Sequence, residues 1–220
     1  MTNDTKVVSF VKGRGVGTNV GSRFHSWSRE MDLDHFEQQR MSGDPEELRA
    51  LRSTEVRLIH AKSILSYNDS PDLGFEQSIN PYQGCEHGCV YCYARPSHAY
   101  LGMSPGLDFE TKIQAKANAA DLLRKELSRP AYRPSLIALG ANTDPYQPAE
   151  RDLGITRSVL EVLAAFNAPV SITTKSALIT RDLDILAGMA AKGLTRVNIS
   201  LATIDTSLAR IMDPRANAPH

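Results

Sequence analysis

From Phe75 onward, short apolar runs alternate with stretches in which apolar residues recur at helical spacing. The apolar runs contain many β-branched residues and little polar alternation, which is typical of strands in a parallel sheet covered by helices. Strand and helix therefore follow one another as repeated βα units, and four such units are predicted. The predicted strands are residues 75–80, 136–139, 170–174 and 196–201.

Each predicted strand is followed by a stretch with helical spacing. The first predicted helix covers residues 112–127, and the second begins near Thr156 as a candidate N-cap. The third starts after Asp182 as a cap and ends at Gly193, and the fourth starts near Asp205. This order predicts the α/β fold class, with the architecture of a (βα) barrel or a part of one.

Residues 1–74 lack this alternation and are predicted to form a largely irregular N-terminal extension, while residues 75–220 form the core, an incomplete barrel. In the extension, a short apolar run is followed by Gly13, Gly15 and Gly17 among basic residues. A glycine-rich turn after a strand suggests a dinucleotide-binding loop, but the spacing does not match G-x-G-x-x-G and no apolar-periodic helix follows. A loop that is flexible or that drapes over the core is therefore the favoured interpretation.

The charge balance is neutral, with 25 Lys and Arg residues against 25 Asp and Glu residues. A neutral chain has no overall field that attracts nucleic acid or an anionic membrane, so a charged substrate must be recognised locally. No apolar run reaches the roughly 18 residues that cross a bilayer, and the N-terminus does not have the order of a secretory signal. We expect a cytoplasmic protein without a membrane partner.

The three cysteines, Cys85, Cys89 and Cys92, lie close together in the chain. An odd number of closely spaced cysteines fits a metal or cluster site better than a disulfide framework. Gly84 and Gly88 permit the tight loop from which thiolates bind adjacent corners of an iron-sulfur cubane. Because the chain has no fourth cysteine, one iron needs another ligand, and the amino and carboxylate groups of S-adenosylmethionine are candidates.

Two other interpretations of the cysteines stay open. The three thiols together with His87 or His98 are the ligand types of a tetrahedral zinc site, although zinc sites usually pair ligands from two separated turns. Cys89 and Cys92 alone have the C-x-x-C spacing of a redox pair, which leaves Cys85 unexplained. His87 lies between two of the cysteines, where a hydrogen bond within the loop is its expected role.

The segment NPYQGCEHGCVYCYARP places Tyr91 just before the last cysteine of a C-x3-C-x2-C motif. In this motif and its surroundings the chain resembles radical SAM enzymes, in the branch related to spore photoproduct lyase. The resemblance runs from about Ser78 to the end of the sequence. Within that branch, the chain is similar to bacterial proteins of unassigned substrate, described as DNA repair photolyase-like, that also begin with a KGRG stretch.

The resemblance implies a [4Fe-4S] cluster on Cys85, Cys89 and Cys92, with S-adenosylmethionine as the second cofactor. An external donor supplies one electron, the cofactor is cleaved to methionine and a 5′-deoxyadenosyl radical, and this radical abstracts hydrogen from a substrate. In such a barrel the working groups lie at the carboxyl ends of the strands. The implied cofactor contacts are Tyr91 of the cysteine motif, Asn142, Thr143 and Asp144 for the methionine portion, Lys175 for the carboxylate, and Ser200, with Thr203 as a weaker candidate, for the ribose.

Two features depart from the family pattern. The lyase uses a cysteine after the second strand as a hydrogen donor, and Ala141 stands at the corresponding place, so repair by that route is not expected. The family barrel normally has six βα units, whereas this sequence stops inside the fourth. That length predicts a barrel truncated after the fourth unit, with an unpaired edge strand.

The resemblance leaves the catalytic residues and the substrate unassigned, and the substrate is a nucleic-acid base, a protein side chain or a small molecule. Tyr146, Gln147 and Glu150, which follow the second strand, are the first candidates for groups near a substrate. A different class of function is a truncated, non-catalytic fragment that binds the cluster. A third is a zinc-stabilised nucleic-acid-binding protein.

Overall fold

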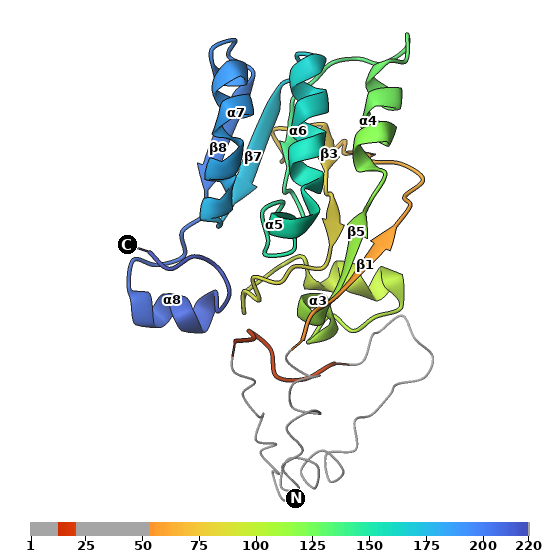
Figure 1. Ribbon diagram of the computed structural model, residues 1–220. Coiled ribbons are helices and arrows are strands. Elements are labelled where there is room, and N and C mark those ends of the chain that lie inside the picture. Colours follow the sequence, from red (N-terminus) through yellow and green to blue (C-terminus); the bar gives the residue numbers. More distant parts are fainter. Residues whose placement is uncertain (1–12, 21–52, 220) are drawn as a thin grey trace, which may run out of the picture.

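The computed structural model describes residues 13–20 and 53–219, shown in Figure 1. The described strands are β1 (Glu55–Ile59), β2 (Leu65–Tyr67), β3 (Gln77–Ile79), β4 (Tyr82–Gln83), β5 (Lys112–Lys116), β6 (Ile137–Leu139), β7 (Val170–Thr174) and β8 (Thr195–Ile199). The described helices are η1 (Arg95–Leu101), α3 (Asp108–Thr111), α4 (Ala119–Leu127), α5 (Glu150–Leu153), α6 (Ile155–Ala165), η2 (Ala177–Asp182), α7 (Leu183–Ala190) and α8 (Thr206–Met212), of which η1 and η2 are 3-10 helices.

A five-stranded sheet with the strand order β2-β3-β6-β7-β8 forms the centre of the fold. Strands β3, β6, β7 and β8 pair in parallel, and β2 is antiparallel to β3. At least one helix lies between each of these parallel strands and the next parallel strand of the same sheet. The predicted α/β class, with successive βα units in a partial barrel, is therefore confirmed.

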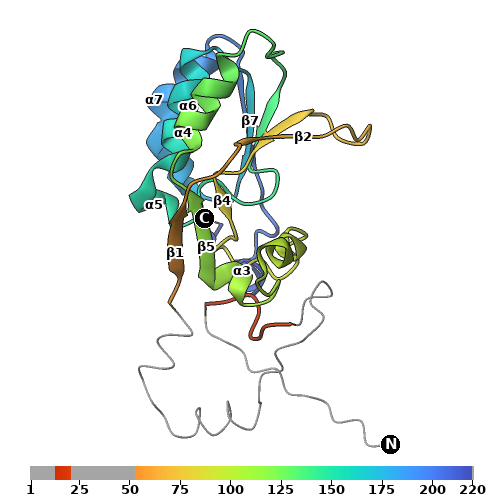
Figure 2. The same ribbon diagram turned by 90° about the vertical axis from the view of Figure 1, so that its right-hand side faces the viewer.

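Helices α4, α6 and α7 cover one face of this sheet (Figures 1 and 2). On α6, Val159, Leu160 and Leu163 recur at helical spacing and are fully buried. On β7, Val170 and Ile172 alternate toward the same layer and are also buried. The main hydrophobic core lies between the helical layer and the sheet.

The prediction of one helix over residues 112–127 is wrong in its first third. Lys112–Lys116 forms β5, which pairs in parallel with β1 and antiparallel with β4 in a second, three-stranded sheet. Ile113 and Ala115 are buried while their neighbours are more exposed, so this stretch has the period of a strand. The helix that follows, α4, covers only Ala119–Leu127.

The predicted strands and helix ends have mixed outcomes. Residues 170–174 form β7 with the predicted bounds. The strands predicted at 75–80 and 136–139 are found in shortened form as β3 and β6, and the one predicted at 196–201 is found as β8, which begins and ends earlier than predicted. The predicted helix start near Asp205 is confirmed, since α8 begins at Thr206 and the Asp205 carboxylate caps it by accepting hydrogen bonds from the Ser207 and Leu208 amides. Thr156 is not the N-cap of α6, because the helix starts at Ile155 after Gly154.

The predicted irregular extension, residues 1–74, lies largely outside the described residues. Within its described part the structure has β1 and β2, two strands that the sequence analysis did not predict. Among the described residues, no helix has the length and apolarity that a bilayer crossing requires.

Asp182 stands at the N-cap of α7, but its carboxylate does not cap the helix. Instead the side chain, which is fully buried, accepts hydrogen bonds from Arg157, Arg181 and the Tyr146 hydroxyl. Burial alone raises the pKa of Asp182, but these hydrogen bonds outweigh it and hold the pKa below its ordinary value. Asp182 thus joins α6, η2 and the loop after β6.

We expect Asp182→Asn to lower the free energy of unfolding by about 1.5–3 kcal/mol near neutral pH, because two arginines lose a charged acceptor. A carboxylate with a lowered pKa stabilises the fold above its unfolded pKa of about 3.9 and loses that effect as the pH falls. The difference between the wild type and Asp182→Asn therefore shrinks as the pH falls below about 3.9. Urea denaturation at several pH values measures both effects.

Asp184→Asn is the matched control, because Asp184 also binds Arg157 but is 60% exposed. Its loss of stability is expected to be much smaller. Equal losses for the two variants, or a loss at Asp182 that does not change with pH, contradict this account of the buried network.

Candidate functional site

The cysteine loop, residues 84–92, follows β4 and carries all three cysteines. It turns at two glycines in the left-handed region of backbone conformation. Gly84 has φ +82° and Gly88 has φ +68°. A Cβ at Gly84 would lie 2.9 Å from the Phe109 carbonyl oxygen, and one at Gly88 would lie 2.7 Å from Glu110 Oε2. Both backbone conformation and space therefore require glycine at these two turns.

All three cysteines are free thiols in the described structure. Cys85 and Cys89 are buried and Cys92 is half-buried. Cys85 packs with Ala94, Phe109 and Cys92, and it interacts electrostatically with both other cysteines. Burial raises the pKa of the Cys89 and Cys92 thiols. The loop thus gathers three thiols in a shielded place, where a bound metal would be needed to stabilise the thiolates.

Three thiols with two histidines nearby are donor types that an iron-sulfur cubane or a zinc ion can use. In the part of the chain that the structure describes, no three His, Cys, Asp or Glu side chains converge as ligands of one metal ion. The cysteines of a cubane each bind a different iron, whereas the ligands of a zinc ion all bind the same metal. The His98 ring packs edge-on against Phe109, and His87 faces Asp144.

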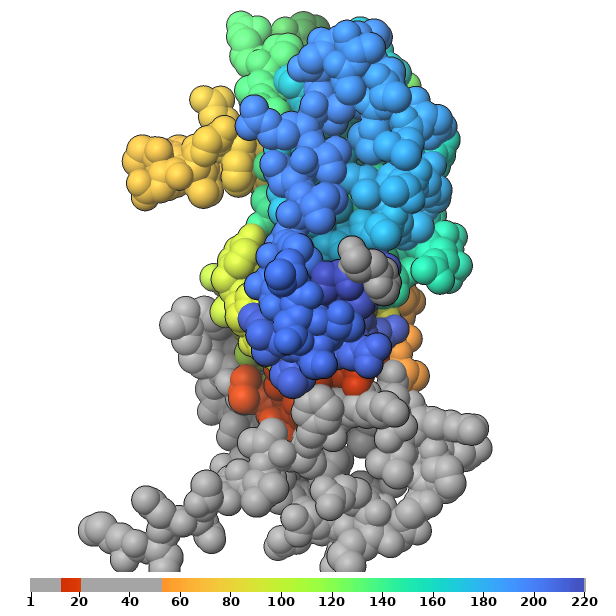
Figure 3. Space-filling view, turned by 90° about the vertical axis from the view of Figure 1, so that its left-hand side faces the viewer, coloured from red at the N-terminus to blue at the C-terminus, as the bar shows by residue number. Residues whose placement is uncertain are grey.

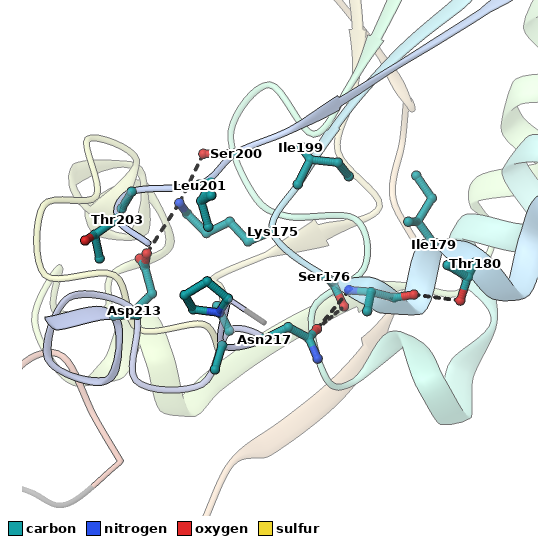
Figure 4. Close-up of a pocket in the computed structure, with 16 residues that line it drawn as sticks. Lys175, Ser176, Ile179, Thr180, Ile199, Ser200, Leu201, Thr203, Asp213 and Asn217 are labelled. Carbon is teal, nitrogen blue, oxygen red and sulfur yellow. Dashed lines mark hydrogen bonds and ion pairs between the residues drawn. The ribbon is translucent and has the colours of Figure 1, made fainter. Parts of the chain in front are cut away.

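Three of the residues predicted to contact a cofactor lie together beside the cysteine loop. Lys175 Nζ donates hydrogen bonds to the Tyr91 hydroxyl at 2.7 Å and to Ser200 Oγ at 3.1 Å. It also lies 3.6 Å from Asp213 Oδ2. Figure 4 shows the contacts of Lys175 with Ser200 and Asp213. Burial lowers the pKa of Lys175, but the contacts with Tyr91 and Asp213 outweigh it and raise the pKa above its ordinary value. A positive charge is therefore held at the carboxyl ends of β7 and β8.

A cavity of about 280 Å³ opens next to this lysine. Its wall is mainly apolar and includes Ile179, Ile199 and Leu201, with Lys175 and Asn217 among its polar members (Figure 4). Thr203, the weaker ribose candidate, also lines the cavity. Lys175 and Asp213 bring a cation and a carboxylate to this apolar wall, and such a lining suits a ligand with a flat apolar part and charged groups.

Asn142 and Thr143 lie apart from the lysine group. The Asn142 side chain donates to Ser97 Oγ, and the Asn142 backbone amide donates to Asn80 Oδ1. Thr143 is buried, and its hydroxyl donates to the Tyr82 carbonyl oxygen of β4. Asn142 is half-buried and keeps some exposed surface, whereas Thr143 is engaged with the strand beneath it.

Asp144 connects the sheet to the cysteine loop. Its carboxylate accepts hydrogen bonds from Thr174 Oγ1 at 2.6 Å and from the Lys175 amide at 2.7 Å, and it lies 3.2 Å from His87 Nδ1. Burial lowers the pKa of His87, but contacts with Asp144 and Cys85 outweigh it and raise the pKa to about 10. His87 thus has the expected contact within its own loop, to Cys85, and in addition an ion pair to the loop after β6.

Tyr146, Gln147 and Glu150, the first candidates for groups near a substrate, lie in the loop after β6 and at the start of α5. All three side chains are buried with almost no exposed surface. Their partners are Asp182 for Tyr146, Gly84 and Glu86 for Gln147, and Tyr82 and Arg181 for Glu150. They hold loops and strands together, because every polar end is already bound inside the protein.

The segment after α8 contributes residues that sequence reasoning missed. Asp213 accepts hydrogen bonds from the Tyr91 hydroxyl at 2.8 and 3.0 Å. Arg215 lies 3.1 Å from Glu86 Oε1, and the Val90 amide donates to the Met212 carbonyl oxygen. No local motif marks these residues, since the contacts join positions more than a hundred residues apart.

Comparisons with known proteins agree with this arrangement. A sequence profile of the radical SAM superfamily matches residues 79–219. An uncharacterized protein of Mycobacterium tuberculosis is 44% identical over 147 residues, which are 67% of this chain and 43% of that protein. An uncharacterized protein of Methanocaldococcus jannaschii is 26% identical over 162 residues, 74% of this chain and 58% of that protein. The chain thus spans about half the length of the curated relatives it matches.

Among solved structures, spore photoproduct lyase complexed with dinucleoside spore photoproduct superposes with a TM-score of 0.56 at 16% identity. The match covers 84% of this chain and 55% of that chain. A mutant of the same lyase gives a TM-score of 0.56 at 17% identity and covers 84% of this chain and 56% of that chain. At these identities the likeness shows a shared fold.

Gln147, in the loop after β6, binds the backbone of the cysteine loop. Its Nε2 donates to the Gly84 carbonyl oxygen at 3.1 Å, and its Oε1 accepts from the Glu86 amide at 3.0 Å, so it binds both neighbours of Cys85. In Gln147→Leu both buried groups lose their partner, at a cost of about 1–3 kcal/mol each. We expect Cys85 to be alkylated about tenfold faster or more in the metal-free chain, as measured by mass spectrometry.

Gln114→Leu on β5 is the matched control, because no side-chain hydrogen bond joins Gln114 to the cysteine loop. An unchanged rate of Cys85 alkylation in Gln147→Leu, or an equal rise in Gln114→Leu, contradicts the role assigned to Gln147.

Proposed function

Because the chain belongs to the radical SAM superfamily, we propose that Cys85, Cys89 and Cys92 bind a [4Fe-4S] cluster whose remaining iron takes S-adenosylmethionine. When bound, the cluster supplies the electron that cleaves S-adenosylmethionine to methionine and a 5′-deoxyadenosyl radical, and this radical abstracts hydrogen from a substrate. The observation that carries this proposal is the contact of Lys175 with Tyr91 of the cysteine loop and with Ser200 after β8.

Lys175 is suited to bind the cofactor carboxylate. Its ammonium group is already held by polar neighbours, so little conformational freedom is lost when an anion arrives. The carboxylate of Asp213 lies 3.6 Å away, so a cofactor carboxylate would share the ammonium group with Asp213 or take its place. The apolar cavity beside Lys175 offers a surface for the adenosine portion, with Ser200 near the ribose.

Asn142 is the best candidate of the three predicted contacts to the methionine portion, since Thr174 and the Lys175 amide already bind the Asp144 carboxylate. The Asn142 side chain keeps exposed surface, whereas the Thr143 hydroxyl is buried against β4. We therefore propose that Asn142 contacts the cofactor directly and that Thr143 fixes the loop on which Asn142 lies.

The substrate is proposed only as a hydrogen donor that reaches the carboxyl edge of the sheet. A nucleic-acid base, a protein side chain and a small molecule all remain candidates, and an external one-electron donor is required. Ala141 offers no thiol, and the chain has three cysteines in total. We propose a reaction that does not use a cysteine of this chain as a hydrogen donor, in a reducing compartment such as the cytoplasm.

Anaerobic reconstitution tests the proposal. The wild-type chain is expected to bind about four iron atoms, with broad visible absorbance that fades on reduction. Reduced protein with S-adenosylmethionine should release 5′-deoxyadenosine, measured by chromatography, and omission of the reductant should prevent this. Alanine at Cys85, Cys89 or Cys92 should remove both the absorbance and the product, because each thiolate binds its own iron.

Two results would overturn the proposal in different ways. Binding of about one zinc atom, with no visible absorbance, would support the zinc-stabilised alternative. A bound cluster without any cleavage of S-adenosylmethionine would support the non-catalytic alternative.

Lys175→Met tests the assignment of the cofactor carboxylate. We expect S-adenosylmethionine to bind about tenfold more weakly or worse, because a charged hydrogen-bond donor is lost, while the iron content stays unchanged. Lys192→Met is the matched control, since Lys192 is exposed and donates to Asn167 away from the site. Equal affinities for the two variants contradict the assignment.

A further inference from the structure

Residues 13–20, here called the N-terminal segment, lie against the cysteine loop and the turn that follows it. Arg14 is buried, with 2% of its surface exposed. Its guanidinium donates to the Glu110 carbonyl oxygen at 3.0 Å and to Thr54 Oγ1 at 2.9 Å. Figure 3 shows the segment in red at the lower edge of the described residues, beneath the blue α8 region. A segment without helix or strand is therefore fixed in place by a buried cation.

The closest approach is between the backbones of Gly15 and Gly88. A Cβ added to Gly15 would lie 1.6 Å from the Gly88 carbonyl oxygen and 2.8 Å from its carbon. Gly88 comes directly before Cys89, so the N-terminal segment touches the loop next to one of its thiols. Only glycine at position 15 permits this contact, because any side chain would have to displace backbone.

Glu110 links the same two parts through hydrogen bonds. Its side chain has no exposed surface, and Oε2 accepts from the Gly15 amide at 3.0 Å. Oε1 accepts from Arg95 Nη2 at 2.6 Å, and the same nitrogen donates to the Cys89 carbonyl oxygen at 2.8 Å. A continuous chain of contacts therefore runs from Gly15 through Glu110 and Arg95 to the backbone of Cys89.

A second anchor fixes the other end of the segment. The Leu107 amide donates to the Thr18 carbonyl oxygen, and a Cβ at Gly106 would lie 2.3 Å from that oxygen. Asn19 and Asp108 exchange two hydrogen bonds, at 2.8 and 3.0 Å. The N-terminal segment is therefore anchored at Arg14 and at Asn19, on both sides of Gly15. Because of these two anchors, the segment resists displacement of the cysteine loop, which it contacts at Gly15.

The contacts do not support a dinucleotide-binding loop. Such a loop presents free amides at the start of a helix. Here the Gly15 amide is bound by Glu110, and the described residues 13–20 contain no helix. Gly15 serves close packing against the cysteine loop.

We propose that the N-terminal segment is a positioning element that fixes Cys89 in the shape required for cluster binding. The proposal rests on the proposed function and extends it to residues that bind no cofactor themselves. Thiolates that bind a cubane must be held in fixed directions, and groups that orient ligands typically change metal affinity by about 10–100-fold when mutated. Gly15, Glu110 and Arg95 are such groups for Cys89.

Gly15→Ala in the full chain tests the proposal, with Gly74→Ala as the matched control because a Cβ at Gly74 meets nothing within 4 Å. After anaerobic reconstitution, iron should be lost to a chelator about 10–100-fold faster from Gly15→Ala than from the wild type. The paramagnetic resonance spectrum of the reduced cluster should also change in line shape. Gly74→Ala should match the wild type in both.

Two further measurements make the outcome decisive. In the metal-free chain, Cys89 should be alkylated faster in Gly15→Ala, while the urea midpoint of global unfolding stays close to that of Gly74→Ala. This readout does not need a cluster, so it tests the positioning role even if reconstitution of the wild type fails. Wild-type rates of iron loss and alkylation in Gly15→Ala, or increases matched by an equal loss of global stability, would overturn the proposal.

Discussion

One buried carboxylate, that of Glu110, determines how the cysteine loop is built. A carboxylate without exposed surface is costly unless charge and hydrogen bonds compensate it. Here Arg95 supplies the charge and the Gly15 amide supplies a further donor. Gly15 also packs against the Gly88 backbone, and Arg95 also donates to the Cys89 carbonyl oxygen. The two groups that bind the Glu110 carboxylate therefore also determine the shape of the cysteine loop. The N-terminal segment, η1 and α3 meet at this point for the same reason.

The sheet supplies the opposite wall of the site. Parallel strands end at one edge, so the loops after β6, β7 and β8 lie beside the cysteine loop. Asp144 binds the backbone of Lys175 and faces His87, which connects two of these loops to the cysteines. Lys175 then reaches Tyr91 and Ser200. The proposed cofactor site therefore depends on strand ends for its cation and on a glycine-rich loop for its thiols.

The sequence predicted the parts of this structure that local patterns determine. The run at residues 170–174 is apolar and β-branched, and it forms β7 with the predicted bounds. The apolar positions of KIQAK, residues 112–116, fit both a strand and a helix. The stretch forms a strand because it pairs with β1, which is distant in the sequence and is not part of the local pattern. Lys175, Ser200 and Tyr91 were assigned through family resemblance, and the structure brings them together. The bond between Arg14 and Glu110 spans 96 residues and has no local signature, so neither residue was predicted to matter.

The central claim is that three thiols leave one iron of a cubane open for S-adenosylmethionine. Mössbauer spectroscopy of chain reconstituted with iron-57 tests it most directly, because each iron contributes its own signal. The account predicts that addition of S-adenosylmethionine shifts the signal of a single iron site and leaves the others in place. A spectrum that does not change on addition of the cofactor, or that shows no cubane iron, would contradict it.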